Sequence, residues 1–165
     1  MAVLEEQLVA ELWARDVRFI LGTAPNHPPM LSPVELIKGL AVSVETRLQL
    51  SLIPVFLRHP EFSTCAESVA KNLPLERQLI LKCFYCAAVW LERKHLSQNN
   101  LPDLFSKDIG LSPTSDPDNN LLSLANRQKE LSGSRINWAA TYQHAADIWL
   151  KDLELRKMKN GKRNS

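Results

Sequence analysis

The sequence predicts an all-α protein: a compact bundle of six or seven helices built from antiparallel hairpins around one central buried helix. The chain has only five Gly but ten Pro, and its Leu- and Ala-rich runs follow helical spacing. Pro33, Pro60 and Pro74 each stand where such a run begins, a position that proline tolerates well. Residues 79–91 are apolar except for Lys82, a composition typical of a helix buried on all sides.

The first helix is predicted over residues 2–21, where apolar residues recur along one stripe. Its glutamates lie in the first half and its arginines in the second, an order that suits the helix dipole. Gly22 follows as a candidate C-cap. Residues 23–31 contain three prolines and therefore predict a loop.

The next helix starts are marked by capping residues and prolines. Residues 32–35 read Ser-Pro-Val-Glu, which predicts a capping box and a helix to about residue 42. Ser43 is expected to cap the following helix, in which Pro54 predicts a kink or a boundary. The short connections favour antiparallel neighbours.

Residues 58–60 are expected to end that helix, and Pro60 is expected to open another that extends to about residue 72. Pro74 then opens the central helix over residues 74–95. Its charged ends, including Glu92, are expected to return this helix to water.

The second half of the chain predicts three more elements. A short helix is expected within residues 101–111, and the polar residues 112–120 predict a mobile loop. Asn120 is expected to cap a helix over residues 121–131, and Asn137 the last helix, which extends to about residue 157. We therefore expect a single helical domain over residues 1–157 and a basic, disordered tail over residues 158–165.

The charge balance is nearly neutral, with a formal net charge of +2. Residues 156–165 hold five basic and no acidic residues, so the rest of the chain carries a formal charge of −3. A basic tail of this kind can contact nucleic acid, an acidic partner or a membrane surface, although a solvated, disordered end is the more common case. Three cysteines, no signal peptide and no membrane segment predict a cytoplasmic protein that does not bind membranes.

Few residues suggest catalysis or metal binding. Cys83 and Cys86 lie in the middle of the apolar helix, where core packing is the favoured interpretation over a redox or zinc site. His144 and Asp147 share a helix face, but no second pair completes a metal site. We expect no cofactor and no metal, and whether the protein is an enzyme stays open.

Two sets of residues are candidate binding positions. The candidates for contact with a partner protein are His59, Trp138, Tyr142 and His144. Trp138 is included because, at a helix start, it can serve as an exposed anchor. The candidates for contact with nucleic acid are Lys157, Lys159, Lys162 and Arg163.

Three motifs in this order resemble a group of uncharacterised bacterial all-helical proteins, often encoded beside small nucleotidyltransferase-domain proteins. They are LRHPEF at residues 57–62, LPDLFS at 101–106 and NWAATYQHAA at 137–146. The resemblance covers roughly residues 30–155 and implies an accessory or antitoxin-like partner of a nucleotidyltransferase. It implies no catalytic residue.

Three functions follow as hypotheses. The leading one is a non-enzymatic interaction module that binds another protein through a groove between hairpins. The first alternative is an accessory factor that binds nucleic acid through the basic C-terminal tail. The second alternative is an enzyme whose site is assembled from distant residues such as His59, Asp103, Tyr142 and His144.

Overall fold

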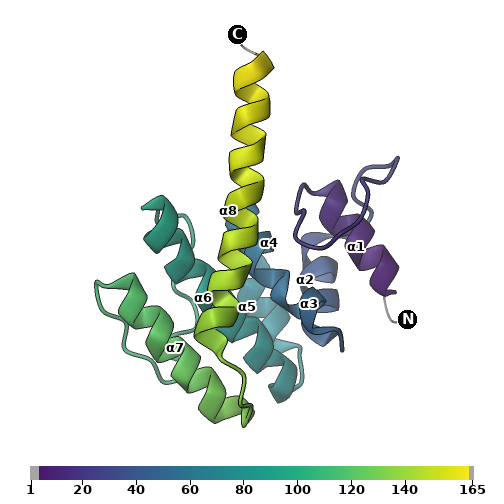
Figure 1. The fold of residues 1–165 in the computed structure, drawn as a ribbon. Helices are drawn as coiled ribbons and strands as arrows, with labels where there is room; N and C mark the ends of the chain where they lie inside the picture. The colour runs from purple at the N-terminus through teal and green to yellow at the C-terminus, as the bar shows by residue number, and fades with distance from the viewer. Residues whose placement is uncertain (1–3, 164–165) are drawn as a thin grey trace.

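The structure is a computed structural model that describes residues 4–163, with side chains up to residue 159. Within this range it contains eight α-helices, one 3-10 turn and no strand (Figure 1). The elements are α1 (Glu5–Ala14), α2 (Pro33–Val42), α3 (Thr46–Leu50), α4 (Leu52–Arg58), η1 (Pro60–Phe62), α5 (Ser63–Lys71), α6 (Leu75–Leu96), α7 (Pro117–Ser132) and α8 (Trp138–Arg163). Only Ser51 separates α3 from α4, so the two form one interrupted helix. The predicted all-α bundle is confirmed.

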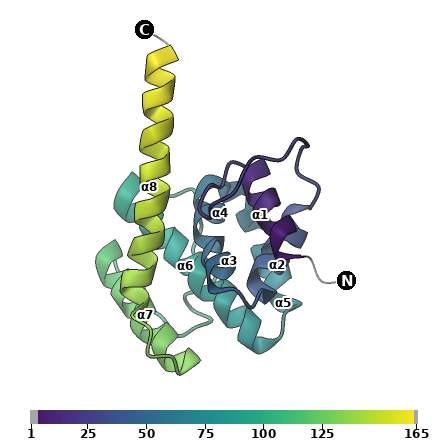
Figure 2. The same cartoon turned by 45° about the vertical axis from the view of Figure 1, so that its right-hand side comes forward.

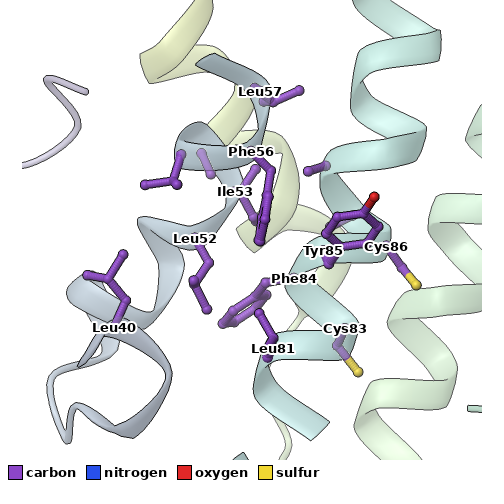
Figure 3. Packing of buried hydrophobic residues seen from close by; sticks show 14 of the residues in the cluster. Leu40, Leu52, Ile53, Phe56, Leu57, Leu81, Cys83, Phe84, Tyr85 and Cys86 are labelled. Atoms are coloured by element: carbon purple, nitrogen blue, oxygen red, sulfur yellow. The ribbon is translucent and has the colours of Figure 1, made fainter. Parts of the chain in front are cut away.

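Helix α6 forms the centre of the bundle, as predicted. It packs against α2, α3, α4, α5 and α7. Figure 3 shows Leu52 and Phe56 of α4 facing Phe84 and Tyr85 of α6. The rings of Phe56 and Tyr85 meet edge to face, with centroids 4.8 Å apart, a favoured aromatic geometry.

The end of α6 differs from the prediction at Glu92. This residue was expected to return the helix to water, but it is 1% exposed. The backbone N–H of Leu101 donates to its carboxylate over 2.9 Å. The buried carboxylate is thus satisfied by the segment that follows the helix, a partner that helical periodicity cannot reveal.

The capping box of α2 is confirmed. The Glu35 N–H donates to the Ser32 hydroxyl over 3.2 Å, and the Ser32 N–H donates to the Glu35 carboxylate over 3.1 Å. The predicted cap at Ser43 is wrong, because Glu45 occupies the N-cap of α3 and the Ser43 hydroxyl accepts the Glu45 N–H. The kink or boundary predicted at Pro54 is displaced, because the interruption lies at Ser51 and Pro54 is inside α4.

The first helix is shorter than predicted. It ends at Ala14, and Asp16 adopts a left-handed conformation with φ of 62°. The N–H of Val17 donates to the Leu12 carbonyl and that of Asp16 to the Trp13 carbonyl, a Schellman pair of bonds that ends a helix. Aspartate tolerates this conformation better than most residues, so the helix stops while Val17 remains buried.

Two predictions between α6 and α7 are also wrong. Residues 101–111 contain no helix, and within them only residues 106–110 form turns, with the Ser106 N–H donating to Asp103. Helix α7 begins at Pro117 with Asp116 as its N-cap. Asn120, the predicted cap, is buried inside the helix, and its side chain bonds the backbone N–H and carbonyl of Thr114. The predicted mobile loop is therefore shorter and fixed at Thr114.

Helix α8 begins as predicted, because the Asn137 side chain accepts the Ala140 N–H over 3.1 Å. It then continues to Arg163, so residues 158–163 of the predicted disordered tail are helical, whereas residues 164–165 of that tail lie outside the described residues. Lysine and arginine are good helix formers and favour a helix C-terminus. The second half of α8 projects beyond the bundle (Figures 1 and 2). Within residues 4–163, no helix is both long and apolar enough to span a bilayer.

Candidate functional site

An apolar groove of about 420 Å³ lies between α6, α7 and the start of α8. Helix α6 contributes most of its apolar wall, and α7 contributes the opposite side. The residues that line it are Gln49, Leu75, Glu76, Leu79, Ile80, Phe84, Gln128, Leu131, Ser132 and Trp138. We call this set the apolar groove.

Aromatic side chains form the inner end of the apolar groove. The ring of Phe84 lies 5.9 Å from that of Trp138, and Trp138 stacks on Tyr142 with centroids 6.4 Å apart. Tyr142 is buried, which raises the pKa of its hydroxyl well above the usual value. The hydroxyl therefore stays protonated and donates to Gln128, which fixes that groove residue in place.

The indole N–H of Trp138 is buried and has no hydrogen-bond partner among the described side chains. A buried donor left unpaired costs on the order of 1–3 kcal/mol, but this nitrogen is closed to solvent, so a ligand acceptor reaches it only when the surrounding side chains move. Leu75 is 83% exposed and Leu131 is 40% exposed at the same groove. The apolar groove thus offers an apolar wall and two exposed leucines.

The four predicted partner contacts do not form one site. Trp138 lines the apolar groove, and Tyr142 supports it from behind through Gln128. His59 belongs to another part of the bundle, where its ring nitrogens face the Arg15 carbonyl at 2.7 Å and the Glu61 carboxylate at 3.1 Å. His144 is exposed on α8.

The structure gives no support to an enzyme site assembled from His59, Asp103, Tyr142 and His144. Each has separate surroundings, and no hydrogen bond or ion pair joins any two of them among the described side chains. Likewise, residues 4–159 contain no group of three or more His, Cys, Asp or Glu side chains that is arranged to hold a metal ion.

The two cysteines of α6 are core residues, as predicted. Cys83 and Cys86 are fully buried. Burial raises the pKa of Cys83 to about 12 and also raises the pKa of Cys86. Because the thiolate is the reactive form, neither position suits redox chemistry in the folded protein.

Thiol labelling tests this conclusion. At pH 8, a thiol with a pKa of about 12 is thiolate in roughly one molecule in ten thousand. We expect an aromatic disulfide reagent to modify the half-buried Cys65 in native protein and all three thiols in 6 M guanidinium chloride. The Cys65→Ser variant should be unreactive when folded. Rapid native labelling of that variant would show that α6 is not buried as described.

A second concavity lies beside α8, on the side that carries Lys157 and Lys159. It has a volume of about 630 Å³ and is lined by Asp16, Arg18, Arg58, Leu153, Arg156, Lys157 and Lys159. We call it the basic cleft. The predicted contacts Lys162 and Arg163 lie outside the described side chains. Sequence reasoning missed Arg18 and Arg58, because only the fold brings them to α8.

No protein-family model, curated protein or solved structure matches the chain. The resemblance of the three motifs to nucleotidyltransferase-associated proteins stays a prediction. Function is therefore argued from the geometry of the apolar groove and the basic cleft.

Proposed function

We propose that the protein is a non-enzymatic interaction module whose apolar groove binds an apolar segment of another protein. The observation that carries this proposal is the exposure of Leu75 and Leu131 on the wall of the apolar groove, beside Trp138. When the groove side chains move on binding, a main-chain carbonyl of the bound segment becomes the acceptor for the buried indole N–H of Trp138. The segment's apolar side chains cover Leu75 and Leu131, which are otherwise exposed to water.

The shape and charge of the apolar groove narrow the class of segment. A groove formed between helices suits an amphipathic helix or a short extended peptide that inserts a few apolar anchors. Glu76 is the only charged residue among those lining it. A lysine or arginine beside the apolar anchors therefore complements this surface. By the resemblance, a nucleotidyltransferase-domain protein is the first partner to test.

The test begins with gentle purification of the tagged protein from its native host and identification of the co-purifying chain by mass spectrometry. Binding of that chain is then measured by calorimetry with the Leu75→Ser/Leu131→Ser variant. We expect affinity to fall about tenfold or more, because two exposed leucines no longer contribute apolar burial. Trp138→Phe should weaken binding about fivefold to 150-fold, because the carbonyl of the bound segment is left without its donor at a cost of about 1–3 kcal/mol.

The matched control is Leu122→Ser/Leu155→Ser, which removes two exposed leucines outside the apolar groove. Its affinity should stay within twofold of the wild type. Equal binding by the groove variant and the control would contradict the proposal. Circular dichroism of every variant checks that the helical content is unchanged.

A further inference from the structure

We propose that the basic cleft binds the phosphate backbone of a nucleic acid strand. This inference is independent of the apolar groove, because the two sites share no lining residue. Three arginines and two lysines line the basic cleft, against one carboxylate, that of Asp16. The cations come from three segments: the turn after α1, the end of α4 and the second half of α8.

The turn after α1 holds the arginines in place. The Asp16 carboxylate lies between Arg18, at 3.7 Å, and Arg58, at 3.9 Å. The Asp16 carbonyl accepts a hydrogen bond of 2.6 Å from Arg156 of α8, which also pairs with Asp152 at 2.9 Å. Asp16, in its left-handed conformation, therefore holds guanidinium groups from three segments in place. A ligand that binds them loses less free energy to the ordering of side chains.

The cations of the basic cleft retain donors for a ligand. The Arg18 and Arg58 pairs are longer than the 2.7–3.2 Å of an ordinary N–H···O hydrogen bond, so their N–H groups are not used up by Asp16. Lys157 and Lys159 make no ion pair with any described side chain. After Asp16 and Asp152 are counted, a surplus of three positive charges remains, which attracts an anion.

The arrangement favours a phosphate strand over other anions. Guanidinium groups bind phosphate with two parallel hydrogen bonds, and a nucleic acid presents phosphates in a continuous row. The cations of α8 recur within about one helical turn, at Arg156, Lys157 and Lys159, and all three line the basic cleft. The cations line a concavity, which a single strand can enter.

The experiment uses the full chain and a fluorescein-labelled single-stranded DNA of 20 nucleotides, with anisotropy measured between 50 and 300 mM NaCl. We expect a dissociation constant of roughly 1–100 μM near physiological salt. Lys157→Gln/Lys159→Gln should weaken binding at least tenfold at 100 mM NaCl. It should also reduce the slope of log affinity against log salt by about 1.4, since each single-strand phosphate contact contributes about 0.7. Arg58→Gln should reduce the slope by about half as much.

The matched control is Lys107→Gln/Lys129→Gln, which removes two exposed lysines outside the basic cleft and should retain wild-type binding. The groove variant Leu75→Ser/Leu131→Ser should also retain it, so failure of one site leaves the other testable. The proposal is overturned if Lys162→Gln/Arg163→Gln abolishes binding while the cleft variants do not. It is also overturned if the protein binds anionic phosphatidylserine vesicles or polyglutamate but not DNA.

Discussion

Phe56→Ala is expected to lower the free energy of unfolding by about 3–5 kcal/mol. Phe56 belongs to α4 and is fully buried where α4 packs against the central helix α6. Its removal loses apolar burial and the edge-to-face contact with Tyr85. The cavity cannot readily collapse, because helical backbone holds both of its walls. Urea titration followed by circular dichroism measures the loss.

Leu122→Ala is the control for this substitution. Leu122 is 54% exposed on α7, so its truncation is expected to change the free energy of unfolding by less than about 0.5 kcal/mol. A loss below about 1 kcal/mol for Phe56→Ala would contradict the packing of α4 on α6. A changed urea dependence would instead indicate a different unfolded or native state.

Alkaline pH is expected to unfold the protein. Burial raises the pKa of Cys83 to about 12 and raises the pKa values of Cys86, Tyr85 and Tyr142. The unfolded chain therefore releases protons from about pH 9, while the folded chain retains them. The contribution of these buried, neutral side chains to the free energy of unfolding is fully present below pH 9 and is lost as the pH rises towards 12. For Cys83, a pKa raised from 9.0 to about 12 corresponds to about 4 kcal/mol.

Urea titrations at pH 7, 9, 10 and 11 measure this loss. Cys83→Ala provides the matched comparison, because it removes one of the buried acids while the others remain. Its stability should decline less steeply with pH, by about 1.4 kcal/mol per pH unit above pH 9. Identical pH profiles for the variant and the wild type would show that Cys83 ionises normally in the folded protein.

Local sequence chemistry was sufficient to predict several helix starts. The capping box at Ser32, the Asn137 cap and the helix that opens after Pro74 depend only on neighbouring residues, and the structure confirms all three. The burial of α6 was also predictable, because a helix apolar on every face has no other stable environment in water.

The errors arise where a residue depends on a distant partner. The buried carboxylate of Glu92 accepts the Leu101 N–H, and the buried side chain of Asn120 accepts the Thr114 N–H. The periodicity of apolar residues in the sequence predicts neither hydrogen bond. The same limit applies to the sites: Trp138 was predicted as an exposed anchor but is buried, and the leucines around it belong to two other helices. Arg18 and Arg58 join Lys157 only through the turn at Asp16.

The projection of α8 divides one helix into two dynamic regimes. Arg156, bonded to Asp16, is its last described tie to the turn after α1. In the turn that follows, the amides rely on intrahelical hydrogen bonds alone, so their hydrogen-exchange rates report a local helix–coil equilibrium. The amides near Tyr142 are packed in the bundle and exchange with global unfolding. The amides near Tyr142 therefore serve as an internal reference for hydrogen exchange along α8. A ligand that contacts the projecting half slows exchange there and leaves the relation between the reference amides and global unfolding unchanged.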